Sequence, residues 1–339
     1  MQTVVLEEPG RFRVVEQAPP GDPPPGQALV RVHRIGICGT DLHAYRGEQP
    51  FFEYPRILGH ELGVEVVAVG ENDRGIEVGD RCAVEPSFNC GQCSPCRRGK
   101  TNCCERLQVL GVHVDGGMRE LMWVPVDKLH KSSRLSLDQL ALVEMLAIGA
   151  HAVRRTQLEP DDHVLVIGAG PIGLSVAQFA RASGVDVIMM EINPNRVAFC
   201  REHFGIDRFI DSLDDPIGDL RRLLDGDLPT VVMDATGNPR SMTAAFNYVA
   251  SGGKLVFVGL FQGDITFHDP EFHRREMTLL SSRNATSEDF RRVLEAVENG
   301  EVDTTAWITH RAHLRELPDV YPQWLSPESR LLKAVVEVP

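Results

Sequence analysis

The stretch that most constrains the fold runs from residue 162 to residue 191. A buried-strand pattern, D-H-V-L-V-I (162–167), leads directly into G-A-G-P-I-G at Gly168–Gly173, and an amphipathic helix to about Ser183 follows. A second strand pattern, 185–190, ends at Glu191, 18 residues after Gly173. A lone G-x-G-x-x-G is a weak signal. Between a strand and a helix, with an acid at this distance, it predicts a dinucleotide-binding βαβ unit.

The residues of this unit have distinct expected roles. Gly168 allows the tight turn, Gly170 lets a pyrophosphate approach the helix N-terminus, and Gly173 lets helix and strand pack closely. Glu191 is placed to accept hydrogen bonds from the adenosine ribose hydroxyls and to repel a 2′-phosphate, which predicts NAD rather than NADP. Arg196 tempers this preference, because a nearby arginine can stack on adenine or accept a phosphate.

The rest of the chain separates into two compositional regions. Strand patterns at 230–233, 254–260 and 277–281 continue the alternation with helices, so residues 150–285 are predicted to form a doubly wound, mostly parallel Rossmann-type domain. Residues 1–149 contain short β-branched runs broken by glycine, proline and aspartate, and no long helix is expected before residue 136. The final run, L-L-K-A-V-V-E-V, predicts a strand that returns to this β-rich domain, which therefore comprises residues 1–149 and 286–339.

Four cysteines predict a closed metal site in a lobe at about residues 88–106. Three of them follow C-x-x-C-x-x-C spacing, and a C-C doublet comes seven residues later. Four thiolates can surround Zn²⁺ tetrahedrally and leave no open position, which makes such a site structural. A disulfide cluster is the competing interpretation, but the spacing and the lack of a secretion signal count against it. Either residue of the doublet, Cys103 or Cys104, can supply the fourth thiolate; our predicted ligands are Cys90, Cys93, Cys96 and Cys104.

A second candidate metal site lies in the first domain. Cys38, His60 and Glu61 are all good ligands for Zn²⁺, and glycines surround them. A hydroxyl group (Thr40) and an imidazole (His43) stand close to Cys38 in the sequence, and together they can pass a proton from an alcohol to solvent. A lone cysteine or histidine is more often simply buried, but the grouping of these residues favours a site.

Glu144 is unusual in the segment 137–155, which is apolar at helical spacing. A carboxylate in so apolar a stretch is costly unless it is paired or bound to a cation. The alternative is a charge on the helix surface, which helical phase alone does not exclude.

Composition narrows the class of protein. The net charge is −13 and no basic block interrupts it, so nucleic acid is an unexpected partner. The longest apolar runs have the length of strands, which predicts no membrane span. The first residues lack a basic region followed by an apolar one, so we expect a cytoplasmic protein.

In order and spacing, these motifs resemble those of the zinc-containing medium-chain alcohol and polyol dehydrogenases over essentially the whole chain. The resemblance rests on G-I-C-G-T-D (36–41), G-H-E (59–61), the four-cysteine lobe and G-A-G-P-I-G (168–173). It implies a GroES-like β-barrel catalytic domain beside the Rossmann domain, two zinc ions per chain, NAD as cofactor, and hydride transfer from an alcohol. It also implies a homo-oligomer, a tetramer or a dimer.

The resemblance assigns roles to individual residues. It makes Cys38, His60, Glu61 and Glu144 the ligands of a catalytic zinc, with Glu61 direct or linked through water. It makes Asp41 the partner that fixes the tautomer of His60, and Thr40 with His43 a proton relay. The implied cofactor contacts, besides the glycines of the motif, are Ile172, Glu191, Arg196, Val258, Gly259, Leu260, Ser282, Arg283 and Asn284. In one departure, Ala44 stands where sorbitol dehydrogenases carry a tyrosine, which disfavours sorbitol as substrate.

Several shorter segments are similar to bacterial hexonate 5-dehydrogenases, which oxidise L-galactonate or L-gulonate at C5. They are 49–56, 101–104, 111–117, 259–264, 269–273 and 282–286. An anionic substrate needs a cationic contact, for which Arg283 is the first candidate and Arg119 the second, although an exposed arginine is more often only solvated. Glu144 is expected to contact the substrate, and Phe51 to wall the pocket unless it is part of the core.

Other functions remain as alternatives. One is oxidation of another polyol or amino alcohol, such as xylitol, sorbitol or L-threonine. Another is a catalytically silent, NAD-sensing regulatory protein, which has no need to retain Thr40, His43 and Glu144. A metal-independent enone reductase of the same fold is disfavoured by the intact set of ligands.

Overall fold

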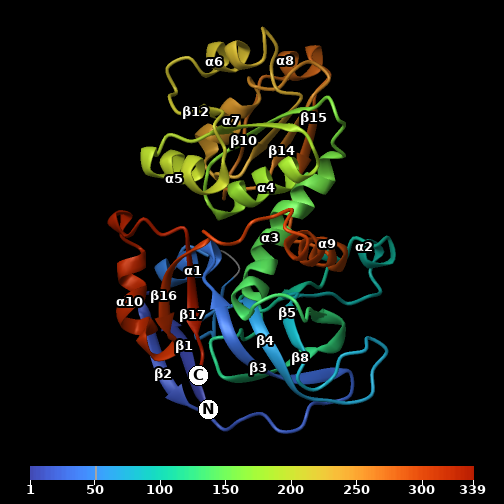
Figure 1. Ribbon diagram of the computed structural model, residues 1–339, viewed down its shortest axis with the longest axis vertical. Coiled ribbons are helices and arrows are strands. Elements are labelled where there is room, and N and C mark those ends of the chain that lie inside the picture. The colour runs from blue at the N-terminus through green and yellow to red at the C-terminus, as the bar shows by residue number, and fades with distance from the viewer. Residues whose placement is uncertain (50–51) are drawn as a thin grey trace. The chain divides into compact units, whose positions relative to one another are not determined.

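A computed structural model describes residues 1–49 and 52–339 (Figure 1). The chain divides into two compact units. The first contains Met1–Ala147, Ala285–Gly300 and Thr304–Pro339, and the second contains Ile148–Asn284 and Glu301–Asp303. The C-terminal part of the chain therefore returns to the unit that the N-terminal part begins.

The second unit is built on a parallel sheet of six strands, in the order β12-β11-β10-β13-β14-β15. The strands are β10 (His163–Ile167), β11 (Asp186–Met190), β12 (Phe209–Ile210), β13 (Val231–Asp234), β14 (Lys254–Phe257) and β15 (Thr278–Ser281). The helices between them are α4 (Pro171–Ala182), α5 (Pro194–Phe204), α6 (Pro216–Leu223), α7 (Pro239–Ala245) and α8 (Asp269–Arg274). The reversal of strand order on either side of β10 is that of a doubly wound sheet, and the predicted fold class is confirmed.

Close packing explains two glycines at the start of α4. Gly168 has φ +97°, a conformation that side chains disfavour. A Cβ atom at Gly173 would lie 1.8 Å from the carbonyl oxygen of Gly168. The turn and the helix therefore touch through backbone alone, as the motif predicts.

The first unit is mainly β. Its largest sheet has the order β16-β17-β3-β4-β5-β9, and β8 also pairs with β3. The strands of this unit are β1 (Gln2–Glu8), β2 (Arg11–Glu16), β3 (Gln27–Gly36), β4 (Glu61–Val69), β5 (Arg81–Val84), β6 (Ser87–Phe88), β7 (Gln108–Val109), β8 (Leu121–Pro125), β9 (Leu129–Lys131), β16 (Ile308–His313) and β17 (Lys333–Glu337). The predicted returning strand is β17, which pairs with both β3 and β16.

Helices in this unit are short, apart from α3 (Leu137–Thr156), which begins in the first unit and ends in the second. The others are α1 (Gly39–Arg46), α2 (Ser94–Arg97), α9 (Ser287–Glu298) and α10 (Leu317–Trp324), with 3₁₀ turns at 101–103, 126–128, 314–316 and 327–329. Because α1 carries Thr40 and His43, the two residues of the expected proton relay lie on one short helix.

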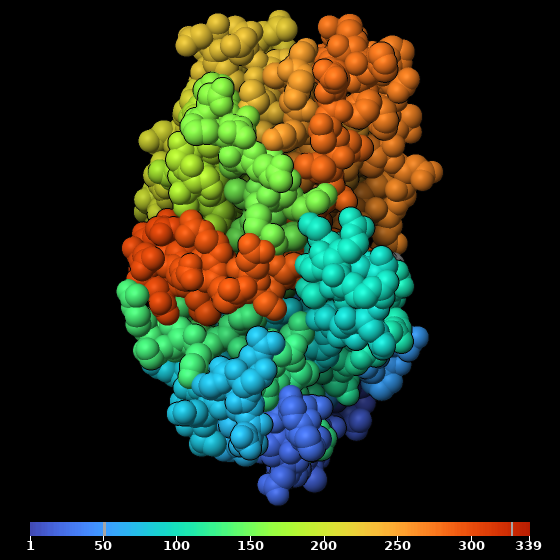
Figure 2. Space-filling model, turned by 90° about the vertical axis from the view of Figure 1, so that its right-hand side faces the viewer, coloured from blue at the N-terminus to red at the C-terminus, as the bar shows by residue number. Residues whose placement is uncertain are grey.

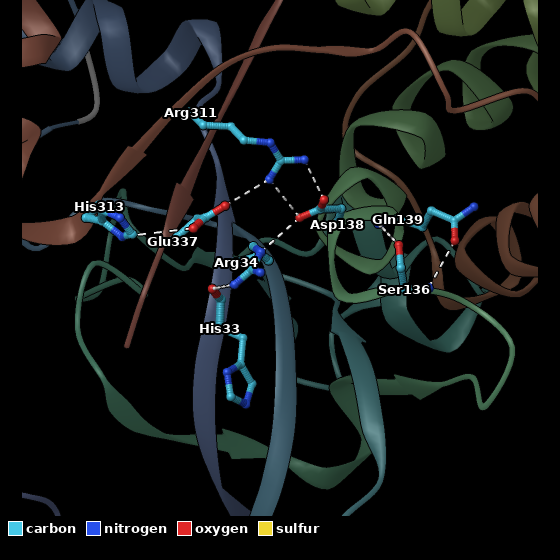
Figure 3. Close-up of polar contacts among 8 residues, drawn as sticks. All are labelled: His33, Arg34, Ser136, Asp138, Gln139, Arg311, His313 and Glu337. Carbon is cyan, nitrogen blue, oxygen red and sulfur yellow. Dashed lines mark hydrogen bonds and ion pairs between the residues drawn. The ribbon is translucent and has the colours of Figure 1, made fainter.

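Polar contacts fix the beginning of α3 (Figure 3). Ser136 and Gln139 form a reciprocal capping box, in which each side chain accepts a hydrogen bond from the backbone of the other, at 3.2 and 3.0 Å. Asp138 accepts hydrogen bonds from Arg34 of β3 (Nε, 2.9 Å) and Arg311 of β16 (Nη2, 2.5 Å). These contacts tie the first turn of the helix to two strands of the sheet.

Candidate active site

The pairing of β3 with β4 brings the three predicted metal ligands together. Gly36, the last residue of β3, lies opposite Glu61, the first residue of β4. Cys38 comes two residues after Gly36 and caps α1, while His60 directly precedes β4. One potential ligand atom from each of Cys38, His60 and Glu61 lies within 4.8 Å of the other two. A Cβ atom at Gly36 would lie 2.1 Å from Glu61 Oε2, so the site leaves no room for a side chain there.

Asp41 contacts two members of this group, Cys38 and His60, and is 1% exposed. One carboxylate oxygen accepts a hydrogen bond from the backbone N–H of Cys38 at 3.0 Å, and the other lies 3.6 Å from Nδ1 of His60. Burial would lower the pKa of His60, but Asp41 and Cys38 raise it well above its usual value. Asp41 thus faces one ring nitrogen and leaves the other for a metal, as a partner of a zinc-bound histidine does.

Lys333 is a member of the site that the sequence did not reveal. Its ammonium group lies 2.7 Å from both carboxylate oxygens of Glu61 and donates to the carbonyl of Ile37 at 3.0 Å. Burial would lower the pKa of Lys333, but the neighbouring Glu61 and Cys38 raise it. The available signal was a lysine in the otherwise apolar strand K-A-V-V, where an unpaired ammonium would be costly.

Glu144 projects from α3 into the same environment and is 9% exposed, so the helix-surface alternative is excluded. Burial raises its pKa to about 7; His60 opposes this rise, and Glu61 adds to it. Among the described residues, the group of potential ligand atoms within 4.8 Å comprises Cys38, His60 and Glu61 without Glu144. The role of Glu144 as a zinc ligand therefore stays a prediction.

The donor atoms of this group, which is buried except for the half-buried Cys38, suit a metal cation. Three carboxylates (Asp41, Glu61, Glu144) and the thiol of Cys38 face the ammonium of Lys333 and the imidazole of His60. Sulfur, nitrogen and oxygen donors in this combination are the ligands that Zn²⁺ prefers. The residues present fit a bound zinc ion.

The two predicted relay residues lie on one face of α1, because they are three residues apart on a helix. Thr40 is half-buried, whereas the side chain of His43 is 58% exposed. Nδ1 of His43 lies 3.0 Å from the carboxylate of Glu48, a contact that the sequence analysis missed. Of the two, Thr40 is nearer to Cys38 in the chain and less exposed than His43.

The four cysteines predicted to bind the structural zinc lie close together in the lobe. Cys90, Cys93, Cys96 and Cys104 each offer a sulfur within 4.8 Å of the others. The backbone N–H groups of Cys90 and Arg106 each donate to Cys104 Sγ at 3.3 Å. Backbone N–H groups of residues 92 and 93 lower the pKa of Cys90 to about 6, which favours the thiolate that zinc needs. Cys103 is exposed and lies outside the cluster. Residues near 100, in turquoise, lie at the surface in Figure 2.

A cavity of about 730 Å³ in the second unit is lined by four of the predicted cofactor residues, Gly168, Gly170, Glu191 and Arg196. Both carboxylate oxygens of Glu191 accept backbone N–H groups at 2.8 Å, from Ala169 and from Asn193. Nη1 of Arg196 lies 3.7 Å from Oε2 of Glu191. The carboxylate of Glu191 therefore partly neutralises the positive charge of Arg196. Other lining residues, which the sequence analysis missed, include Thr236, Asn238, Arg240 and Tyr248.

The remaining predicted cofactor residues are not among those that line this cavity. Ile172 is the second residue of α4, and Gly259 packs so closely that a Cβ atom there would lie 2.3 Å from the backbone nitrogen of Gly237. The other members follow the carboxyl ends of β14 and β15, the edge at which doubly wound sheets bind ligands; they are Val258, Leu260, Ser282, Arg283 and Asn284.

The predicted substrate contacts differ in how the structure places them. Arg283 lies just beyond β15 in the second unit. Arg119 is half-buried rather than solvated, donates to the carbonyl of Asp115 at 3.3 Å, and lines a separate cavity whose described lining contains none of the predicted catalytic residues. This position argues against Arg119 as a substrate contact. Phe51 lies outside the described residues.

Comparison with known proteins agrees with this arrangement. The family model of the alcohol dehydrogenase GroES-like domain matches residues 24–134, and that of zinc-binding dehydrogenases matches residues 171–299. The chain is 42% identical to L-galactonate-5-dehydrogenase of Escherichia coli K12 over 94% of this chain and 92% of that one. The chain belongs to the zinc-binding dehydrogenase family.

Two further relatives of this zinc-binding dehydrogenase bear on its cofactors and chemistry. Sorbitol dehydrogenase of Bacillus subtilis is 31% identical over 99% of this chain and 97% of that one. The structure of the RspB alcohol dehydrogenase of E. coli CFT073, complexed with NADH, superposes with a TM-score of 0.91 at 30% identity and covers 99% of both chains. The predictions of an enzyme, of zinc and of a nicotinamide dinucleotide are confirmed.

Among the described residues, no helix of this dehydrogenase has both the length and the apolar character needed to cross a bilayer.

Proposed function

We propose that this dehydrogenase oxidises the secondary hydroxyl at C5 of a six-carbon sugar acid, such as L-galactonate or L-gulonate, with NAD as acceptor. The observation that carries the proposal is the group of half-buried Cys38 with buried His60 and Glu61, whose donor atoms fit a zinc ion. The similarity to L-galactonate-5-dehydrogenase supports the choice of substrate.

When bound, zinc polarises an alcohol and NAD accepts a hydride, and the side chains supply the remaining steps. Asp41 holds His60 in its binding tautomer, and Lys333 holds the carboxylate of Glu61. Thr40 accepts the proton of the substrate hydroxyl and passes it toward His43, whose exposed ring releases it to water. Buried Glu144 completes the polar wall around the reacting hydroxyl.

Two residues set specificity in this proposal. Arg283 pairs with the carboxylate of the sugar acid, a bond for which a planar guanidinium group is suited. Glu191 is held in place by hydrogen bonds from two backbone N–H groups. Its carboxylate accepts hydrogen bonds from the ribose hydroxyls of NAD and repels the 2′-phosphate of NADP.

A substrate panel tests the proposal. The purified enzyme is given L-galactonate, L-gulonate, sorbitol, xylitol and L-threonine, and NADH formation is measured. We expect the highest kcat/KM for a hexonate. A higher kcat/KM for a neutral polyol or for threonine would reject the sugar-acid assignment, and zinc-loaded protein without activity on the whole panel would favour the sensing role.

Substitution of Arg283 by methionine sharpens this test. The loss of the guanidinium group should raise KM for the hexonate at least about tenfold, because one charge-assisted bidentate contact is lost. Activity on a neutral polyol should change little and serves as the matched control. Equal losses on both substrates would assign Arg283 to cofactor binding instead.

Oxidation of a neutral polyol is the second candidate function. The similarity to sorbitol dehydrogenase over almost the whole chain favours it. Ala44, where sorbitol dehydrogenases carry a tyrosine, counts against sorbitol itself.

A further inference from the structure

A chain of polar side chains in the first unit, buried at Glu85 and Lys128 and half-buried at Asn89, reaches the four-cysteine lobe, and the proposed reaction does not use it. It starts at Glu85, which follows β5 and is 1% exposed. Glu85 accepts hydrogen bonds from Lys128 Nζ at 2.6 Å, from His130 Nε2 at 3.1 Å and from Ser287 Oγ at 2.6 Å. Burial would raise the pKa of Glu85, but His130 and Lys128 hold it below its usual value, so the carboxylate is charged.

Lys128 extends the chain toward the lobe. Its ammonium group lies 2.8 Å from Oδ1 of Asn89, and Nδ2 of Asn89 lies 3.8 Å from Sγ of Cys96. An ammonium group can only donate hydrogen bonds, so the oxygen of the Asn89 amide must face Lys128. The amide N–H₂ group must then face the sulfur, and chemistry alone fixes which way this amide points.

An N–H group directed at a zinc-bound thiolate affects how firmly the metal is held. Four thiolates leave a zinc site with surplus negative charge, which hydrogen-bond donors stabilise. Cys104 receives such bonds from the backbone N–H groups of Cys90 and Arg106. Cys96 receives one from the side chain of Asn89, whose orientation depends on residues distant in sequence.

We propose that Asn89, held in orientation by Lys128 and Glu85, tunes the retention of zinc by the four-cysteine lobe. Asn89 acts as a positioning residue for the thiolate of Cys96. Lys128 acts through Asn89 and does not touch the metal site. Because Ser287 is the first residue of α9 and also binds Glu85, the same carboxylate joins the C-terminal part of the first unit to this chain.

Two substitutions of Asn89 separate orientation from packing. Asn89→Asp keeps an oxygen for Lys128 but replaces the donor facing Cys96 by an acceptor. Asn89→Leu keeps the approximate volume and removes both polar contacts. Gln108→Leu removes an exposed amide of β7, opposite Phe88 and so close to Asn89, and is the matched control.

The measurement is the rate at which the holoenzyme transfers zinc to the chelator 4-(2-pyridylazo)resorcinol, in a Cys38→Ser background so that the zinc of the lobe is followed. Both Asn89 variants should release zinc about 10-fold to 100-fold faster than the parent, the range found when outer-shell partners of a metal ligand are removed. The control should match the parent. Release by both Asn89 variants within about twofold of the parent would overturn the proposal.

A double-mutant comparison tests the dependence on Lys128. Lys128→Met should accelerate release, and the Lys128→Met/Asn89→Leu double variant should release zinc no faster than Asn89→Leu alone, because Lys128 acts through Asn89. Lys128→Arg keeps a donor-only group and should stay near the parent rate. Fully additive effects would overturn the relay from Lys128 to Asn89.

Discussion

The ammonium group of Lys333 lies 2.7 Å from both carboxylate oxygens of Glu61, although 272 residues separate them in the chain. Both side chains are buried, at 2% and 0% exposure. A buried ion pair of this kind need not stabilise the fold relative to apolar residues, but removal of one partner leaves the other charge without compensation. In this enzyme the pair also holds a candidate zinc ligand.

Substitution of Lys333 by methionine should therefore be strongly destabilising. We expect the free energy of unfolding to fall by about 3–5 kcal/mol, the usual cost of breaking a buried pair. The measurement is equilibrium denaturation in urea. The double variant Lys333→Met/Glu61→Gln should recover part of the loss, since it removes both charges, and a double variant less stable than Lys333→Met alone would contradict this explanation.

Replacement of Cys38 by serine should abolish turnover and leave dinucleotide binding intact. The thiol is one of the donor atoms proposed for zinc, whereas the cavity that contains Glu191 belongs to the other unit. Turnover, zinc content and NADH affinity are measured on the same preparation. A serine variant with near-normal turnover would show that the zinc assignment is wrong.

Replacement of Glu191 by alanine should relax the preference for NAD. The change removes the negative charge that is expected to repel a 2′-phosphate, and Arg196 at 3.7 Å is then free to attract it. The ratio of kcat/KM for NAD to that for NADP should fall at least about tenfold, equivalent to about 1.4 kcal/mol. Arg196→Ala is the matched control and should move the ratio in the opposite direction. An unchanged ratio in Glu191→Ala would contradict the assignment.

The contacts of Asp138 should make stability depend on pH. Burial would raise the pKa of Asp138, but Arg311 and Arg34 lower it below its usual value (Figure 3). A carboxyl group whose pKa is lower in the folded state stabilises the fold above its unfolded pKa, and this contribution disappears as the pH falls through the folded value. The three side chains are 26–44% exposed, so screening by solvent limits the effect to about 1 kcal/mol.

Asp138→Asn should accordingly be less stable than the parent at pH 7, and the difference should shrink as the pH falls below about 4, near the ordinary pKa of aspartate. Urea denaturation at several pH values measures it. A difference that stays constant with pH would mean that the contacts act through packing or helix capping and not through charge.

We also expect the protein to be a homo-oligomer that pairs through β15, whose outer edge has no partner strand in the part of the chain that the structure describes. This strand ends the parallel sheet, and three of its four residues are exposed, including Leu279 at 38%. An exposed sheet edge is a ready site for pairing with another chain. Leu279→Pro should lower the molar mass measured by light scattering, and an unchanged mass would exclude this edge as the interface.

The sequence was sufficient to predict a site when the residues of that site lie close together in the chain. The glycines from Gly168 to Gly173 and the spacing Cys90–Cys96 each define a site within a few consecutive residues, and both appear as expected. The helix α1 was missed because its sequence G-T-D-L-H-A-Y-R includes poor helix formers; the bond between Cys38 N–H and Asp41 closes its first turn. Lys333 was missed because no local pattern links it to Glu61, and only the pairing of β17 with β3 brings them together.

The position of β17 between β3 and β16 has a consequence for synthesis on the ribosome. The sheet whose strands β3 and β4 end next to Cys38 and His60 has an open gap until residues 333–337 have been synthesised, whereas all but three residues of the second unit are already present at residue 284. Because domains fold as units while the chain is made, the nucleotide-binding half can mature first. The first unit, which carries the candidate metal ligands, completes its sheet only after β17 has been synthesised. Until then, the carboxylate of Glu61 lacks its partner Lys333.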